Sequence, residues 1–346
     1  MKKKTQGAVL VLGLMAAVMV IGCTITVRDS LATESLPPET PTTPATPITP
    51  TTPTTPTTPT TEPGVIVNAD SQDLSIKFGV TSDGKTRVSD TLAQVHAYLG
   101  KNPAAPNGIN LGDYLDLPSL EVELLYAVGE FLDDTVSEQV TVSAQIMVVG
   151  INSFNGKNNN GTTPHLVFQF KDALVDRTMG TLTMPYTYIG SGMQDYLNGD
   201  FLAGLTAAGV PAGLLWAPSR VIAEAFDACD ATPITDKVWL PTEWEIFGTN
   251  INSVSAAETS SNQARLEYYT TPERRKKVLS DSSATPTDYW LASPLFAHNM
   301  LEVDCQCACK VSCDGYASYS YAYAGIGDPI SFAADSLGLA PAFCVQ

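Results

Sequence analysis

Residues 239–248 read WLPTEWEIFG, and two related stretches follow, DYWLASP at 288–294 and GLAPAF at 338–343. They are the most distinctive part of the sequence, because the first places two tryptophans and a phenylalanine beside two glutamates. We expect Trp239, Trp244 and Trp290 to form the scaffold of the C-terminal third.

Between the last two stretches lies a tyrosine-rich segment. Four tyrosines fall between 316 and 323, interleaved with Ser and Ala. At the period of a strand, Tyr319, Tyr321 and Tyr323 share one face and the small residues share the other. Tyrosine beside small polar residues is the composition of an antibody paratope. The alternative is a core strand, but buried phenols need hydrogen-bond partners, so we predict an exposed tyrosine face.

Upstream, short apolar runs are separated by Gly, Asn, Pro and Asp clusters. Alternation predicts strands at 140–149 and 165–170. Helical spacing predicts helices at 94–99 and 193–205, with a third candidate at 219–228. The chain lacks a strand–helix–strand rhythm and a Gly-rich phosphate loop, so the predicted class is α+β.

Several separated motifs carry a resemblance to a known family. They are LGDYLDLPSL at 111–120, VVGINSFNGKNNNGTTPHLVFQFK at 148–171, LWAPSR at 215–220, WLPTEWEIFG, DYWLASP and GLAPAFCV at 338–345. In this order they resemble the variable proteins of diversity-generating retroelements, specifically the Treponema variable protein and its lipoprotein relatives. The resemblance covers roughly 105–346.

The resemblance implies a C-type-lectin fold related to the formylglycine-generating enzymes. In that family an error-prone reverse transcriptase rewrites solvent-facing positions of the C-terminal segment, here about 295–337. The segment 295–310 is longer than in the family pattern, which leaves the start of the variable face open. Carried over by position, the ligand-binding candidates are Ser312, Cys313, Asp314, Tyr316, Ser318, Tyr319, Tyr321 and Tyr323.

The N-terminus resembles the signal of a bacterial lipoprotein. Three lysines at 2–4 precede an apolar run at 8–21, which is shorter than the roughly 20 residues that span a bilayer. Val-Ile-Gly-Cys at 20–23 then resembles a lipobox, so Cys23 is the expected lipidation site. The alternative is an ordinary secretory signal that contains a cysteine. Acyl chains on Cys23 would anchor the protein in the cell envelope, on the outer membrane or the cell surface.

A Thr/Pro-rich stalk follows at 35–63. Such a composition cannot bury enough apolar surface to fold, so we expect a disordered, polyproline-like linker. The expected organisation is a signal peptide at 1–22, a lipid-anchored linker at 23–63, an N-terminal portion at 64–117 and a C-type-lectin-like domain at 118–346.

The charge balance restricts the partners. The formal net charge is −17, and it becomes −20 when the three lysines of the signal are removed. A nucleic-acid partner is therefore not expected, because phosphate binding needs a basic surface. The expected partners are a macromolecular or glycan ligand and, through the lipid, a membrane.

Cysteines at 305, 307, 309 and 313 raise the question of a metal or a disulfide. Alternating cysteines on a strand point the same way and splay poorly into a tetrahedral zinc site, so we predict no metal and no cofactor. A disulfide between positions two apart is equally awkward. Pairing with Cys229 or Cys344 and unpaired surface thiols both remain open.

The sequence offers two enzymatic alternatives. Cys309 and Cys313 are close to the cysteine pair of a formylglycine-type oxidase, but the basic, Gly-rich surroundings of that pair are missing. No G-x-S-x-G motif accompanies the histidines at 96, 165 and 298, and His165 is expected to be structural. Glu243 and Glu245 are expected to satisfy backbone groups. We therefore predict a binder and not an enzyme, with an oxidase or a structural envelope lipoprotein as alternatives.

Overall fold

The computed structural model describes residues 62–80, 86–103, 106–128, 134–179, 188–223, 231–253, 258–280, 285–295, 307–321, 325–327, 330–332 and 335–346. The predicted signal, Cys23, most of the stalk, Cys229, His298, Cys305 and Tyr323 lie outside the described residues. The described residues belong to one compact unit within Thr57–Gln346.

The structure is a mixed α+β fold with more strand than helix, as the sequence predicts. The helices are α1 (Leu74–Lys77), α2 (Thr86–Lys101), α3 (Gly192–Asn198), α4 (Asp200–Ala207), α5 (Glu243–Phe247) and α6 (Pro272–Arg275). The strands are β1 (Tyr114–Val128), β2 (Asp134–Ile151), β3 (Leu166–Phe170), β4 (Asp176–Arg177), β5 (Leu215–Trp216), β6 (Arg220–Ala223), β7 (Ala231–Ile234), β8 (Val238–Trp239), β9 (Lys277–Val278), β10 (Pro286–Thr287), β11 (Tyr289–Pro294), β12 (Cys307–Val311), β13 (Ala317–Tyr321), β14 (Gly325–Gly327), β15 (Ile330–Phe332), β16 (Leu337–Gly338) and β17 (Ala342–Val345).

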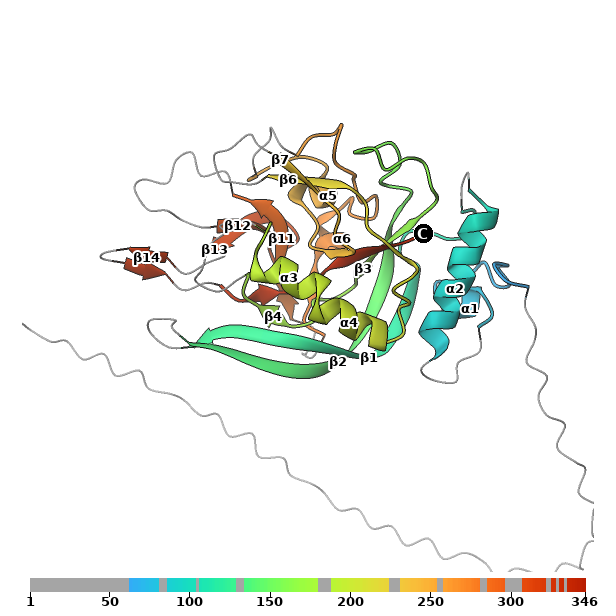
Figure 1. The fold of residues 1–346 in the computed structure, drawn as a ribbon, viewed down its shortest axis with the longest axis horizontal. Helices are drawn as coiled ribbons and strands as arrows, with labels where there is room; N and C mark the ends of the chain where they lie inside the picture. The colour runs from blue at the N-terminus through green and yellow to red at the C-terminus, as the bar shows by residue number, and fades with distance from the viewer. Residues whose placement is uncertain are drawn as a thin grey trace, which may run out of the picture. The chain divides into compact units, whose positions relative to one another are not determined.

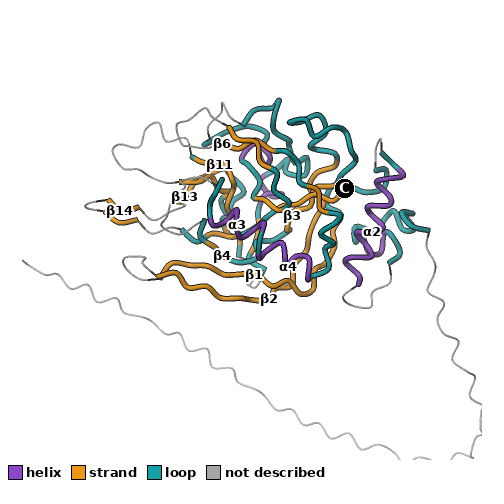
Figure 2. The backbone as a smooth tube through the Cα atoms, viewed as in Figure 1, coloured by secondary structure: helices purple, strands orange, loops and turns teal. Residues whose placement is uncertain are grey.

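One large sheet organises these elements (Figures 1 and 2). Its strand order is β13-β12-β11-β16-β4-β1-β2-β3-β17-β5, with β8 also paired to β17. The C-terminal strand β17 therefore lies inside the sheet, between β3 and β5. The boundary expected between residues 117 and 118 falls inside β1, and the buried ion pair Lys77–Asp113 (2.5 Å) joins α1 to the segment before that strand.

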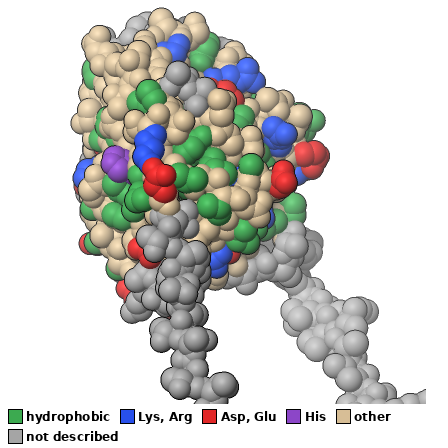
Figure 3. All heavy atoms as spheres, turned by 90° about the vertical axis from the view of Figure 1, so that its right-hand side faces the viewer, with side chains coloured by type: hydrophobic (Ala, Val, Ile, Leu, Met, Phe, Trp, Pro, Cys, Tyr) green, Lys and Arg blue, Asp and Glu red, His purple; other side chains and the backbone are tan. Residues whose placement is uncertain are grey.

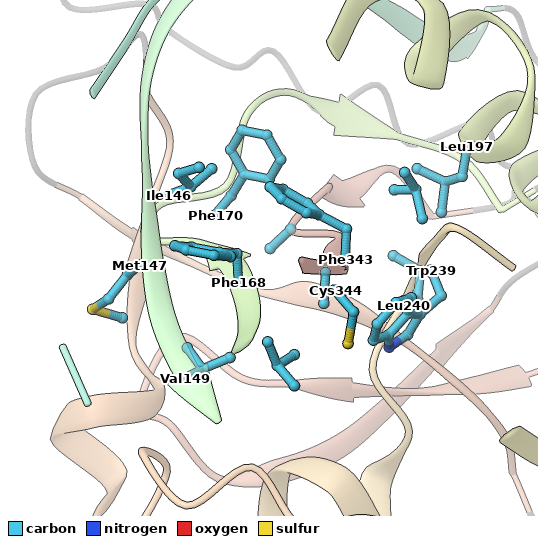
Figure 4. Packing of buried hydrophobic residues seen from close by; sticks show 14 of the residues in the cluster. Ile146, Met147, Val149, Phe168, Phe170, Leu197, Trp239, Leu240, Phe343 and Cys344 are labelled. Carbon is cyan, nitrogen blue, oxygen red and sulfur yellow. The ribbon is translucent and has the colours of Figure 1, made fainter. Parts of the chain in front are cut away.

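The core lies where β3 and β17 meet (Figure 4). Phe343 is paired in register with Phe168, and their rings stack with centroids 5.7 Å apart. Both side chains are fully buried, and each such burial contributes about 1.5–3 kcal/mol to folding. Trp239 and Leu240 approach the same cluster from β8 and the residue after it.

The strands predicted at 140–149 and 165–170 are confirmed as parts of β2 and β3, and the helix predicted at 94–99 as part of α2. The single helix predicted at 193–205 is broken at Gly199, whose ψ of −103° lies outside the helical region and divides α3 from α4. Gly204 then lets α4 lie close to β1, because a Cβ there would stand 2.8 Å from the Glu121 carbonyl oxygen.

The helix predicted at 219–228 is wrong for the residues that the structure describes. Arg220–Ala223 forms strand β6, paired antiparallel with β7 from Arg220↔Ile234 to Ala223↔Ala231. The β-branched Val221 and Ile222 fit this strand, and Arg220 is buried and ion-paired within it.

No helix in the described part of the chain has the length and apolar character needed to cross a membrane. The side of the unit that carries α1 and α2 shows acidic and basic side chains close together among hydrophobic ones (Figure 3).

Candidate functional site

The tyrosine-rich segment forms an antiparallel hairpin of β12 and β13. Cys309 pairs with Tyr319 and Val311 with Ala317. The turn between the strands is closed by backbone bonds from Ser312 N to Tyr316 O (2.8 Å) and from Gly315 N to Ser312 O (2.7 Å). The sequence predicted the strand, while the turn places Tyr316 just before it.

The turn is held against the body of the unit. Gly315 has φ +82°, and a Cβ there would stand 2.2 Å from the Pro272 carbonyl oxygen, so only glycine fits against α6. Arg275 Nε donates to Gly315 O at 2.8 Å. Cys313 N donates to the carboxylate of Asp288 at 2.7 Å. The hairpin end is therefore held by three contacts at two positions, Cys313 and Gly315.

A further set of polar contacts ties the two strands together. Lys310 Nζ lies 2.6 Å from the Asp288 carboxylate and donates to Ser320 Oγ at 3.2 Å. Ser320 Oγ in turn donates to the Asp335 carboxylate. These bonds lie on the side of β13 that carries the small residues.

On the opposite side of the hairpin, Cys309 and Val311 of β12 are fully buried, and the exposed part is formed by the tyrosines. Tyr316 is 60% exposed and Tyr319 is 41% exposed, whereas Ser320 is only 8% exposed. The predicted alternation of an outer tyrosine face and an inner small-residue face is therefore observed at Tyr319 and Ser320. Asp314 is also exposed.

The remaining candidates are less accessible or less defined. Ser312, Cys313 and Ser318 are half-buried. The Tyr321 side chain is not among those described, although its backbone belongs to β13. The structure thus brings seven of the eight candidates onto one hairpin, and Tyr323 lies outside the described residues.

The three scaffold tryptophans lie in different places. Trp290 is fully buried in β11, next to β12, where it pairs with Lys310 and donates through Nε1 to Arg177 O at 2.7 Å. Trp239 is equally buried, but its ring meets Phe154 and the guanidinium of Arg220, near the other end of the sheet order. Trp244 is half-buried on α5. Among the three, Trp290 is the one whose strand supports the hairpin.

Both glutamates of WLPTEWEIFG satisfy backbone groups, as predicted. Thr242 and Glu245 form a capping box at the start of α5, with Thr242 N donating to Glu245 at 2.8 Å. The Glu243 carboxylate accepts from the backbone N–H groups of Ile251, Asn252 and Ser253 at 2.8–3.1 Å. These side chains are fully buried, so they stabilise the loop and cannot reach a ligand.

Sequence reasoning missed a group of cations beside the hairpin. Arg274, Arg275 and Lys276 lie on and after α6, where Arg275 Nε donates to Gly315 O of the turn, and the negative charge of Asp314 acts on Lys276. Arg265 joins them, since its charge acts on Arg275. The run ERRKK at 273–277 was the available signal, although nothing local in the sequence links it to Arg265.

The cysteines are placed for packing. Cys307 and Cys309 are buried in β12, and the Cys309 thiol faces Pro294 O at 3.7 Å. Burial raises the pKa of Cys309 well above its usual value, and the nearby Glu243 and Glu258 carboxylates add to the rise. A reactive cysteine needs the opposite shift. Among the described residues no cluster of His, Cys, Asp and Glu has the arrangement of a metal site.

His165 has a structural environment. Its Nδ1 donates to Thr163 O at 2.9 Å and its Nε2 accepts from Phe154 N at 3.1 Å, so the ring is neutral. Burial lowers its pKa. Both ring nitrogens are therefore engaged inside the core, as expected from its position before an apolar strand.

A groove of about 570 Å³ lies elsewhere among the described residues. It is formed by α2, the residues before β3, β5 with its flanking residues, and the last residue of the chain. Its lining is His96, Leu99, Gly100, Thr163, Pro164, Gly213, Leu214, Leu215, Trp216, Ala217 and Gln346. None of the predicted ligand-binding residues contributes to it.

The geometry thus defines an α+β protein with an exposed aromatic hairpin at one end of its sheet. The family described as Domain of unknown function (DUF6273) matches residues 169–346, and the chain belongs to this family. The match includes the hairpin and its supporting strand β11. Comparisons with curated proteins and with solved structures found no match.

Proposed function

We propose that this protein is a surface-displayed lipoprotein that binds a macromolecular ligand through the β12–β13 hairpin. The observation that carries the proposal is the exposure of Tyr316 and Tyr319 on a hairpin anchored by Arg275 and Asp288. Large aromatic rings held in solvent on a firmly bonded backbone lose little entropy when they become buried in an interface.

The surrounding chemistry favours recognition over turnover. The titratable groups with the clearest shifts toward neutral pH, Glu258 and Lys277, are fully buried. The Cys309 thiol is buried with a raised pKa, unlike the activated thiolate of an oxidase. Replacing Cys309 and Cys313 with Ser separates the two functions, because it would abolish an oxidase and leave ligand binding through the tyrosines.

The family resemblance extends the proposal. The hairpin would belong to a C-type-lectin-like domain. A lipid on Cys23 would anchor the protein, and the Thr/Pro stalk would hold the hairpin away from the membrane surface. Diversification would alter the side chains of the hairpin. The DNA beside the coding region tests the last point. A near-copy of the 3′ coding segment that differs at adenines, beside a reverse-transcriptase gene, is expected, and its absence would remove diversification from the proposal.

The binding function is tested on the full chain, purified in detergent and applied to an array of immobilised cell-surface proteins and glycans. We expect binding to a subset of them. Changing both Tyr316 and Tyr319 to Ser is expected to weaken this binding at least about tenfold, because exposed tyrosines at an interface act as anchors. Ile76→Ser on α1 is the matched control, since Ile76 is 50% exposed on another element and should leave binding unchanged.

Two results would reject the receptor. The first is a wild-type protein that binds nothing on the array. The second is a tyrosine double variant that binds every captured ligand as tightly as the wild type while the circular dichroism spectra agree.

A further inference from the structure

Four cations lie on or near α6, which contacts the anchored end of the hairpin through Arg275, and we call them the cationic rim: Arg265, Arg274, Arg275 and Lys276. Arg265 and Arg274 are exposed, and Arg275 and Lys276 are half-buried. Tyr316, which is 60% exposed, directly follows Gly315, whose carbonyl oxygen accepts from Arg275 Nε at 2.8 Å. The rim and the tyrosine face are therefore parts of one surface.

The arginines of the rim are held in position by their surroundings. The Arg275 guanidinium lies 4.7 Å from the centre of the Phe247 ring, and Arg274 lies 5.0 Å from that of Tyr268. Arg274 also donates to Tyr268 O at 3.3 Å. The Arg265 side chain packs against Gly248, since a Cβ at Gly248 would stand 3.0 Å from the Arg265 Cδ. Ordered arginines lose less freedom on binding an anion than mobile ones do.

These arginines have no carboxylate partner among the described residues, because the only ion pair of the rim joins Lys276 to Glu273 at 2.8 Å. Yet the chain holds 36 acidic residues against 19 basic ones. Arg275 has a lowered pKa, first through burial and also through the like charge of Arg265. The repulsion between these unpaired arginines is reduced when a ligand places its own anions beside them.

The strand next to the rim, β13, also restricts the class of ligand. Among the strands that the structure describes, β13 is the last in the order of the large sheet, so one of its edges carries backbone groups that none of these strands pairs with. An extended polypeptide can add to such an edge through main-chain hydrogen bonds. A glycan lacks the alternating N–H and C=O groups for this pairing.

We propose that the ligand of the hairpin is an acidic polypeptide segment, extended along the edge of β13, with its carboxylates on Arg265, Arg274 and Lys276. The assignment rests on the proposed binding function and specifies its ligand class. Arg275 has a different role, since its bonds to Gly315 O and Tyr269 O (3.2 Å) hold the turn in place.

Poly-L-glutamate serves as the probe, and the full chain as the binding protein. Changing Arg265 and Arg274 together to Gln is expected to raise the Kd for poly-L-glutamate at least about tenfold, since each is an ordered, unpaired guanidinium. Lys101→Gln on α2 is the control, because Lys101 is paired with Glu62 at 2.9 Å and α2 lies on the side of the unit opposite β13 (Figure 1). The control should leave the Kd within about twofold, as distant surface charges act weakly at physiological salt.

Two charge-matched probes separate strand addition from simple charge attraction. Poly-D-glutamate has the wrong chirality for a regular ladder with β13, and polygalacturonate has carboxylates but no peptide backbone. Both are expected to bind at least about fivefold more weakly than poly-L-glutamate if main-chain pairing contributes. Equal binding of all three probes would overturn the polypeptide assignment.

Failure of this inference is distinguishable from failure of the receptor. If an arrayed ligand needs Tyr316 and Tyr319 but is bound equally by the Arg265/Arg274 variant, the acidic class is wrong and the receptor stands. If poly-L-glutamate binding is unchanged by the arginine variant, the rim is not the anion site and the inference is overturned.

Discussion

Arg220 and Glu245 form an ion pair from which water is fully excluded. Arg220 Nε and Nη2 each lie 2.8 Å from a carboxylate oxygen of Glu245, and both side chains are fully buried. The pair connects β6 with α5, and Arg220 Nη2 also donates to Leu240 O at 3.1 Å. It links three segments that are separate in the sequence.

Breaking this pair on one side should destabilise the protein strongly. Glu245→Gln and Arg220→Met are each expected to lower the free energy of unfolding by about 3–5 kcal/mol, because either change leaves one buried charge unpaired. The double variant should recover part of the loss. Denaturant titrations of all four proteins measure this coupling, and single variants that lose less than about 1 kcal/mol would contradict it.

Gly315→Ala tests how firmly the hairpin turn is held. The added Cβ would meet Pro272 O, and alanine is also strained at φ +82°, so we expect a displaced turn and a loss of about 2–3 kcal/mol. Gly156→Ala is the matched control: its φ is +71°, but no atom lies within 4 Å of the added Cβ, so it should lose only the backbone strain of about 1–2 kcal/mol. Thermal denaturation compares the two. Equal losses would show that contact with α6 does not restrain the turn.

Glu258 predicts a specific dependence of stability on pH. Burial raises its pKa from 4.5 to about 8, with the charges of Glu243 and Glu245 adding to the rise against a bond from Ser293. The folded protein therefore keeps this proton in a range where the unfolded chain has lost it. The stabilisation is fully present below about pH 4.5 and is lost as the pH rises toward 8.

Glu258→Gln should remove this dependence, because glutamine retains an acceptor for Ser293 and does not ionise. Denaturant titrations at pH 5 and pH 8 should show a smaller fall in stability for the variant than for the wild type. Exposed Glu273→Gln is the control and should keep the wild-type fall. The same fall in all three proteins would show that Glu258 ionises normally.

The elements whose structure depends on the spacing of nearby residues were predicted correctly. Alternation at 140–149 identified β2, and the outer position of Tyr319 against the inner Ser320 followed from the two-residue period. The strand at Arg220 was not predicted, because the apolar spacing at 219–228 also fits a helix and the pairing with β7 depends on a tertiary partner. The break at Gly199 was missed because the apolar spacing continues across it.

In the candidate site, too, some features follow from the local sequence and others depend on tertiary contacts. The tyrosines could be found from composition, but the cationic rim could not. Arg265 lies beside Gly248 and Arg274 on α6 lies over Tyr268, and the folded chain brings α6 to the hairpin through the bond from Arg275 to Gly315 O. Likewise, the sequence does not distinguish Trp290, which backs the hairpin, from Trp239, which packs on Phe154.

The thiols of the hairpin should differ sharply in reactivity. Cys309 is buried and its pKa is well above the usual value because of that burial, as is the pKa of Cys344, whereas Cys313 is half-exposed in the turn. Since the thiolate is the reactive form, iodoacetamide at pH 8 should label Cys313 at least about tenfold faster than Cys309 or Cys344 in the native protein. Peptide mapping by mass spectrometry measures each site separately. Labelling in denaturant is the control, and the differences should vanish there. A fast reaction at Cys309 in the folded protein would contradict its burial and would revive the oxidase alternative.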